Sequence, residues 1–237
     1  MKKFVAVVLA LVMTLSLCAC NSLDYKEAME LYEDESYERA RELFVELGDY
    51  ENSAEMVNQC DYQLALEHME DGEYEEAKAL FVELDTFEDS AEKVVECNYE
   101  IAQAALEAGE YQQAYELFLE LGDYKDSAEM AKECRNKEID ALLQGHWEAV
   151  NSGLVFNYKF VGGRFEASLS VGANSISNEG SYRIDTESGE IYVCYGYTFS
   201  SSGTKTPNTE EQLLFTYTYD GSSFTLTNST GETVTKK

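Results

Sequence analysis

The chain has 237 residues, of which 44% are hydrophobic and 27% charged, a globular composition with room for one large or two modest domains. Its formal net charge is −29, and residues 21–144 carry 36 acidic against 9 basic side chains, whereas residues 145–237 carry 10 against 6. A surface this acidic repels phosphate backbones and anionic lipid headgroups, which excludes nucleic-acid binding and favours either simple solubility or attraction to a basic partner.

Residues 1–19 have the pattern of a secretory signal. Two lysines precede an apolar run at 4–17, which is too short to be a membrane-spanning helix. The run ends in Leu-Cys-Ala-Cys, and this ending resembles the lipobox of bacterial lipoproteins. The resemblance implies that Cys20 receives a diacylglycerol, becomes the mature N-terminus and anchors the protein to the outer face of the bacterial cell membrane. The alternative is ordinary cleavage and secretion, which leaves Cys20 as a free thiol.

One phrase recurs three times in the middle of the chain. Residues 37–60, 74–97 and 111–134 align at an offset of 37 residues, and ten of the 24 aligned columns are identical in all three copies. A fixed period of this length is typical of a solenoid, in which one supersecondary unit stacks on the next. We therefore predict a helical-repeat domain over residues 20–144, with repeats near 24–52, 53–89 and 90–126 and a capping helix at 127–143.

Each repeat is predicted to hold a short helix and a longer one. In the middle copy Tyr74, Ala77 and Phe81 recur at three- and four-residue spacing, which is one face of a short helix. The longer helix runs about 18 residues, for example Ser53 to Glu70. The residues expected to end the short helices in a left-handed conformation are Gly48, Asp85 and Gly122. The residues expected to open helices through a capping box, each followed three positions later by Glu, are Asp24, Asn52, Asp89 and Asp126.

Two phrases in these repeats resemble the core of the tetratricopeptide repeat. Residues 72–81 and 109–118 both read Gly-Glu-Tyr-x-x-Ala-x-x-x-Phe. The closing proline of that family is absent here, and a turn of the type Gly-Asp-Tyr-x-Asp-Ser-Ala-Glu stands in its place. The resemblance implies paired helices in an α-solenoid that mediates interaction with a protein or peptide.

The resemblance also places three columns of side chains along an inner face. These columns are Tyr25, Tyr62 and Tyr99; Met29, Leu66 and Gln103; and Tyr32, Met69 and Leu106. Exposed in a shallow groove, such side chains would suit an extended peptide or a partner helix, and their acidic neighbours would favour a basic one. The alternative is that they pack between the repeats.

The repeated cysteines are predicted to be structural. Cys60, Cys97 and Cys134 share one column, and stacked helices lie ~8–10 Å apart, which is too far for a disulfide. We expect three free, mostly buried thiols. No motif with metal-ligand spacing, no nucleophile constellation and no phosphate-binding loop occurs in the sequence, so we expect no metal, no cofactor and no catalytic residue.

The hydrophobic period changes from 3.6 to 2 at Gly145, which predicts an antiparallel β domain over residues 145–237. Strands are expected at His146–Val150, Leu154–Phe160, Arg164–Val171, Gly180–Asp185, Glu190–Tyr197, Gln212–Tyr219, Ser223–Asn228 and Glu232–Lys236, with a longer loop at Ser200–Thr209. Consecutive short antiparallel strands predict a meander that closes into a small barrel or a strongly curved sheet. The fold class is therefore multidomain α plus β.

The opening Gly145-His146-Trp147 resembles the Gly-x-Trp start of lipocalin-like domains. The resemblance implies a compact barrel, either filled by its own side chains with Trp147 as a plug or holding a small apolar ligand. The expected function is thus that of a non-enzymatic, lipid-anchored cell-surface scaffold whose repeats bind a protein or peptide. The alternative is a carrier or sensor of a small hydrophobic ligand, with the barrel as binding domain and the repeats as a stalk.

Overall fold

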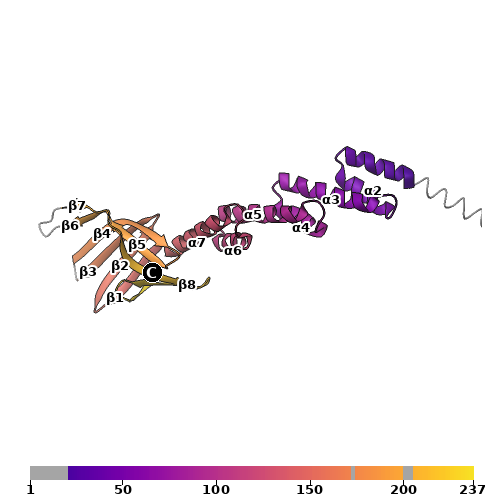
Figure 1. The fold of residues 1–237 in the computed structure, drawn as a ribbon. Helices are drawn as coiled ribbons and strands as arrows, with labels where there is room; N and C mark the ends of the chain where they lie inside the picture. The colour runs from indigo at the N-terminus through magenta and orange to yellow at the C-terminus, as the bar shows by residue number, and fades with distance from the viewer. Residues whose placement is uncertain (1–20, 172–173, 200–204) are drawn as a thin grey trace, which may run out of the picture. The chain divides into compact units, whose positions relative to one another are not determined.

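The computed structural model describes residues 21–171, 174–199 and 205–237, and it consists of consecutive helices followed by a closed antiparallel β-barrel (Figure 1). This is the predicted fold class. The chain forms two compact units, the first ending at Gln103 and the second running from Ala104 to Lys237. The predicted signal at 1–19 and the predicted lipidation site Cys20 lie outside the described residues. Within the ranges described, no helix has the length and apolar character needed to cross a membrane.

The first unit is built from short and long helices in alternation. Residues 21–33 are helical, so the prediction that this helix begins at a cap on Asp24 is wrong, because the three residues before Asp24 already belong to it. The helices that follow are α2 (Tyr37–Leu47), α3 (Ser53–Glu70), α4 (Tyr74–Leu84) and the first part of α5 (Ser90–Ala108). Their buried side chains form two clusters, Ala28, Ala40, Phe44, Met56 and Cys60, and Ala65, Ala77, Phe81, Leu84 and Cys97. Small alanines let paired helices approach, and the phenylalanines fill the space between them.

The second unit places a helical hairpin beside the barrel. The end of α5 is followed by α6 (Tyr111–Leu121) and α7 (Ser127–Leu143), and the strands begin directly after α7. The barrel strands are β1 (Gly145–Asn151), β2 (Leu154–Val161), β3 (Arg164–Val171), β4 (Asn174–Asp185), β5 (Glu190–Tyr195), β8 (Gln212–Tyr219), β9 (Phe224–Asn228) and β10 (Thr233–Lys236). They close in the order β1-β10-β9-β8-β5-β4-β3-β2, which confirms the predicted meander. Closure removes the sheet edges, because β1 pairs with both β2 and β10.

The repeated cysteines are free and buried, as predicted. Cys60, Cys97 and Cys134 are all fully buried, and none of them forms a disulfide. Burial raises the pKa of the Cys60 and Cys97 thiols to about 11, which keeps them protonated and unreactive at neutral pH. They act as small apolar packing groups.

The capping boxes predicted for α3 and α7 do not form. Asn52 and Asp126 hold the N-cap positions, but neither side chain bonds to the backbone of the helix that follows. Asn52 Oδ1 instead accepts a hydrogen bond from the hydroxyl of Tyr25, and Asp89 Oδ1 accepts one from Tyr62 at 2.5 Å. In both cases the tyrosine lies 27 residues earlier, on the first helix of the same repeat. The acceptor that would cap the following helix is therefore used to hold the first helix of a repeat to the turn after its second helix.

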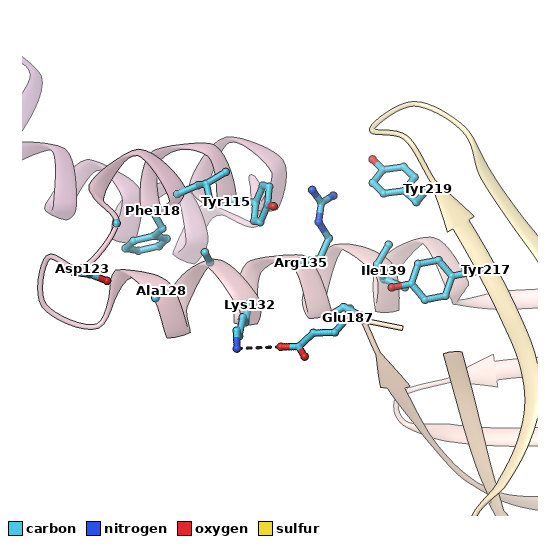
Figure 2. Close-up of a pocket in the computed structure, with 14 residues that line it drawn as sticks. Tyr115, Phe118, Asp123, Ala128, Lys132, Arg135, Ile139, Glu187, Tyr217 and Tyr219 are labelled. Carbon is cyan, nitrogen blue, oxygen red and sulfur yellow. Dashed lines mark ion pairs between the residues drawn. The ribbon is translucent and has the colours of Figure 1, made fainter. Parts of the chain in front are cut away.

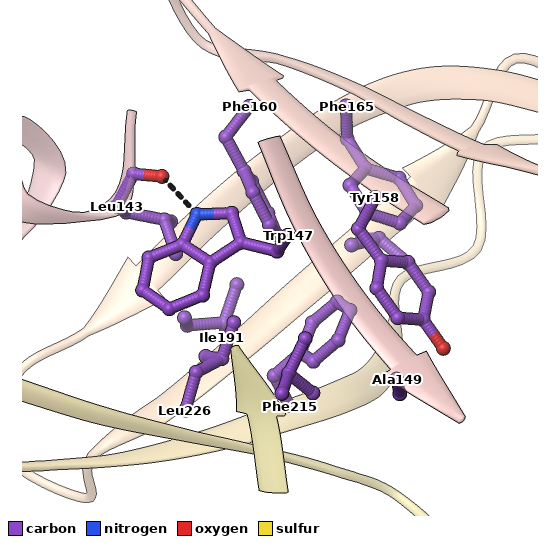
Figure 3. Packing of buried hydrophobic residues seen from close by; sticks show 11 residues of the cluster. Leu143, Trp147, Ala149, Tyr158, Phe160, Phe165, Ile191, Phe215 and Leu226 are labelled. Carbon is purple, nitrogen blue, oxygen red and sulfur yellow. Dashed lines mark hydrogen bonds between the residues drawn. The ribbon is translucent and has the colours of Figure 1, made fainter. Parts of the chain in front are cut away.

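One end of the barrel is filled by aromatic and branched side chains (Figure 3). Phe160, Phe165 and Phe215 are fully buried there, and their ring centroids lie 5.1 to 5.9 Å apart. Trp147 is 5% exposed, and its Nε1 donates a hydrogen bond of 2.7 Å to the backbone oxygen of Leu143. The last turn of α7 therefore closes this end of the barrel through Trp147.

A short ribbon branches from the barrel where a loop was predicted. The expected loop at Ser200–Thr209 is partly wrong, because β7 (Lys205–Pro207) pairs antiparallel with β6 (Tyr197–Phe199). Pro207 lacks a backbone N–H, so it fits an edge strand of a two-stranded ribbon but would be unsuitable for a central strand. The stretch was predicted to be a loop because it is rich in serine, glycine and threonine.

Candidate functional site

A cleft of about 520 Å³ lies between the α6–α7 hairpin and the barrel in the second unit (Figure 2). We call it the helix–barrel cleft. It is lined by Tyr115, Phe118, Leu119, Gly122, Asp123, Ala128, Ala131, Lys132, Arg135, Ile139, Thr186, Glu187, Tyr217 and Tyr219. The lining comes from both helices, from the β4–β5 turn and from β8, so the cleft depends on the packing of the hairpin against the barrel.

The floor of the cleft is apolar because of the spacing of residues on α7. Ala128 and Ala131 lie three residues apart and therefore on one face of the helix, where their small side chains leave room above the backbone. Ile139 continues this face toward the barrel and is fully buried. Phe118 of α6, also fully buried, completes the floor. A ligand entering here would exchange water for hydrocarbon contacts.

The wall of the cleft is an arginine held between tyrosines. The guanidinium carbon of Arg135 lies 4.0 Å from the ring centroid of Tyr115 and 5.6 Å from that of Tyr219 (Figure 2). Nη1 donates a hydrogen bond of 2.7 Å to Oε2 of Glu138, and the hydroxyl of Tyr219 donates one of 2.7 Å to Oε1. Glu138 is 8% exposed, and this pairing satisfies its charge. The hydrogen bond to Glu138 raises the pKa of Tyr219.

The rim of the cleft is closed by an exposed ion pair. Lys132 Nζ lies 3.0 Å from Glu187 Oε1, which joins α7 to the β4–β5 turn (Figure 2). The two side chains are 67% and 77% exposed, so the pair contributes little to stability and separates at low cost. The hydroxyl of Thr186 makes a second contact across the rim, a hydrogen bond of 3.1 Å to Asn136.

A second, smaller hollow of about 320 Å³ opens at the barrel end opposite Trp147. We call it the barrel mouth. Its lining includes Tyr158, Tyr195 and Asn228 together with apolar side chains of β2, β3 and β8. Burial raises the pKa of both tyrosines. Ile176 also lines the mouth and is 72% exposed, which leaves a large apolar side chain uncovered at this end.

The nine residues of the predicted groove are found mostly within the packing of their own repeats. Tyr25 and Tyr62 are half-buried, and Tyr99 is 5% exposed. The ring centroids of Tyr25 and Phe44 are 5.8 Å apart, as are those of Tyr62 and the equivalent Phe81. Those partly buried against the two helical core clusters are Met29, Tyr32, Leu66 and Met69. Gln103 Nε2 donates to the Tyr99 hydroxyl at 2.9 Å, and Leu106 is half-buried. Peptide binding at these columns stays a prediction.

The helix–barrel cleft was not predicted from the sequence, although the repeat contains a signal for it. An ion pair between Arg41 of α2 and Asp61 of α3 joins the first repeat to the second. The residues two repeats later are Tyr115 and Arg135, which make the cation–π contact of the cleft wall. The arginine lies on the short helix α2 in the first pair and on the long helix α7 in the last pair, where it is close to the barrel. This departure from the repeat marks the place where the helices meet a different neighbour.

The described residues contain no group of three or more His, Cys, Asp or Glu side chains arranged to hold a metal ion. The chain matches no protein-family model, no curated protein and no solved structure. A function is therefore inferred from the chemistry of the helix–barrel cleft, of the barrel mouth and of the surface.

Proposed function

We propose that this protein is a non-catalytic binding protein, held on the outer face of a bacterial membrane by lipid on Cys20, whose helix–barrel cleft receives an apolar or aromatic side chain of a protein or peptide. The observation that carries the proposal is the composition of the cleft, an alanine, isoleucine and phenylalanine floor beside a wall of tyrosine and arginine. Tyrosine and arginine are the residues most enriched at the energetic centres of protein interfaces. The likeness of the helices to tetratricopeptide repeats supports the same role.

The direct test uses a small aromatic probe and a variant that fills the cleft. Amide proton–nitrogen NMR spectra of the mature chain with Cys20→Ser are recorded during titration with N-acetyl-tryptophanamide. We expect shifts at Tyr115, Arg135 and Tyr217 that are lost in Ala128→Trp, because the indole would occupy the space above Ala128. The matched control is Ala91→Trp, since Ala91 is the equivalent exposed residue one repeat earlier.

The control separates filling of the cleft from a general effect of the added ring. Ala91→Trp should leave the probe shifts unchanged. If Ala128→Trp also leaves them unchanged, or if no residue of the cleft responds to the probe, the cleft is not the binding site.

Lipid anchoring is tested separately. The full precursor expressed in a bacterium should partition into the detergent phase of a Triton X-114 extract, because two or more acyl chains anchor a protein stably. Cys20→Ser should move it to the aqueous phase, whereas Cys18→Ser should not. Equal partitioning of the wild type and Cys20→Ser would contradict the anchor.

A second candidate function is carriage of a small hydrophobic molecule in the barrel mouth. It is favoured by the 320 Å³ hollow and by the exposed Ile176 beside it. The fluorescence of Nile red should rise on binding there and should be lost in Ala167→Phe, because Ala167 lines the hollow. Ala128→Trp in the helix–barrel cleft is the control, and an equal signal from both variants would reject the mouth as a site.

A further inference from the structure

The outer face of each short helix carries one exposed apolar side chain at the same repeat position. These residues are Val45 on α2, Val82 on α4 and Leu119 on α6, and they are 53%, 57% and 60% exposed. Single exposed apolar residues are ordinary on a protein surface. Here the same kind of side chain recurs at an offset of 37 residues, although the columns three and four positions before it vary in charge and size. Because the exposed apolar side chain recurs in each repeat, it is a regular feature of the surface that the short helices form.

The exposed residues around Val45 and Val82 are mostly acidic. On α2 the exposed residues near Val45 include Glu38, Glu42 and Glu46. Glu38 lies seven residues before Val45, Glu42 lies three residues before it, and Glu46 follows it directly. Glu38 and Glu42 share one face of the helix with Val45, whereas Glu46 lies at the edge of that face. None of the three glutamates forms an ion pair with another described residue. The exposed residues from Glu38 to Glu46 also include one base, Arg39, so the face is an apolar point with an excess of carboxylates.

The same pattern recurs on α4. Val82 is preceded by Glu75 and Ala79 at the equivalent positions and followed by Glu83, and all of these side chains are exposed. Glu83, like Glu46, makes no ion pair within the ranges described. Because α2 and α4 belong to successive repeats of the first unit, their equivalent positions face the same way, as in other solenoids.

Charge decides what can cover this surface. A second copy of the chain would bring the same carboxylates against it, and the net charge of −29 opposes that association. An anionic membrane surface is repelled for the same reason. A segment that alternates lysine or arginine with leucine-like residues satisfies both features, because its cations reach the glutamates while its apolar side chains cover the valines.

We propose that the outer faces of α2 and α4 form a docking surface for a cationic amphipathic segment of a partner protein, with Val45 and Val82 as apolar contacts and Glu46 and Glu83 as charge partners. The surface is separate from the helix–barrel cleft, since neither valine lines that cleft, whereas the equivalent Leu119 on α6 does. It also lies on the short helices, whereas the groove predicted from the sequence lies on the long ones.

The test measures binding of a defined probe by isothermal titration calorimetry. The probe is an acetylated, amidated peptide of about 18 residues in which leucine and lysine follow helical spacing, and the protein is the mature chain with Cys20→Ser. We expect binding that weakens about tenfold in Val45→Ser/Val82→Ser, because two apolar contacts are lost. Both valines are more than half exposed, so the variant should fold normally, as circular dichroism would verify.

Two controls separate apolar docking from attraction between opposite charges. Ala54→Ser/Ala91→Ser changes two equivalent exposed residues of the long helices and should leave the affinity within twofold. A peptide with the same lysines but serine in place of leucine should bind at least tenfold more weakly than the amphipathic probe. Equal binding of the two peptides, or an unchanged affinity of Val45→Ser/Val82→Ser, would overturn the proposal.

The cleft variant keeps this test independent of the proposed function. Ala128→Trp should not alter the affinity for the amphipathic peptide, because Ala128 lies in the second unit and outside this surface. A loss of binding in Ala128→Trp without a loss in Val45→Ser/Val82→Ser would place the peptide in the cleft and reject the docking surface.

Discussion

Tyr219 of the barrel donates a hydrogen bond of 2.7 Å to Glu138 of α7, and the other oxygen of the same carboxylate accepts a hydrogen bond from Arg135. The carboxylate is 8% exposed and both of its oxygens are used. A buried charge with one partner removed is costly, whereas a fully paired one fixes the geometry around it. This triad therefore sets how α7 meets the barrel and, with it, the shape of the helix–barrel cleft.

Because of this triad, substitution of Glu138 should lower the stability of the second unit markedly. Glu138→Gln should lower the free energy of unfolding of the second unit by about 2 kcal/mol, because the charge-assisted bond to Arg135 is lost, and Tyr219→Phe by about 1 kcal/mol. Urea denaturation followed by the fluorescence of the single tryptophan, Trp147, measures both changes. The double variant should lose less than the sum of the two single effects.

Glu133 provides the matched control on the same helix. Its carboxylate pairs with Lys137 at 3.3 Å, but the two side chains are 50% and 46% exposed. Glu133→Gln should change stability by no more than about 0.5 kcal/mol. A loss for Glu133→Gln as large as that for Glu138→Gln would show that net charge, and not the triad, is responsible.

Trp147 is expected to contribute more to the barrel than any other single side chain. Trp147→Phe removes the hydrogen bond to the Leu143 carbonyl and leaves a cavity at the closed end, so it should cost about 3 kcal/mol. Thermal unfolding followed by circular dichroism gives the change. Val161→Ala, at a side chain that is 52% exposed, should shift the melting temperature little, and comparable shifts for both variants would contradict this role.

The fold was largely predictable because the repeat period and the alternation in the strands are strong local signals. The bounds of α3, β3 and β8 match the predicted ranges. The errors occur where a residue serves a distant neighbour. Asn52 has the sequence context of a helix cap, yet it accepts a hydrogen bond from Tyr25, and no local pattern contains that information.

The helix–barrel cleft was not predictable from local patterns for the same reason. Tyr115 and Arg135 belong to the repeat, whereas Tyr217 and Tyr219 alternate along a strand, and only the packed unit brings them together. A comparison between repeats would have identified Arg135, because the equivalent positions hold Asp61 and Asn98. Departures from an internal repeat are thus more informative about function here than the residues that all copies share.

Asp85 occupies a backbone conformation that suits glycine. Its φ and ψ are 52° and −104°, close to the 57° and −117° of Gly48 and the 58° and −115° of Gly122 at the equivalent positions. An L-residue is strained there, whereas glycine is not. Asp85→Gly should therefore stabilise the first unit by about 1 kcal/mol, measured by urea denaturation.

The reverse change at an equivalent glycine controls for the loss of a carboxylate. Gly48→Asp should destabilise the same unit by about 1 kcal/mol. No atom lies within 4 Å of a Cβ built at Gly48, so the cost would be conformational and not steric. If Asp85→Gly is neutral while Gly48→Asp destabilises, strain at Asp85 is not the explanation.

The hydrogen bond to Asp89 gives Tyr62 an unusual titration. The bond to Asp89, together with burial, raises the pKa of Tyr62 to about 12. The folded state therefore holds the phenol proton more tightly than the unfolded chain, where the pKa is about 10. This contribution to stability is fully present below pH ~10 and is lost as pH rises through ~12. The stability difference between the wild type and Tyr62→Phe should accordingly shrink over that interval.

The charge on Asp89 is the part of this effect that a single substitution can remove. Asp89→Asn keeps a hydrogen-bond acceptor, and asparagine already occupies the equivalent position at Asn52, where it accepts from Tyr25. Carbon NMR of the labelled tyrosine ring, assigned with Tyr62→Phe, should show the Tyr62 pKa moving from about 12 toward 10 in Asp89→Asn. The phenol is partly shielded by Phe81 and Phe87, so some of the elevation should remain. An unchanged pKa would mean that the charge of Asp89 does not contribute to the elevation.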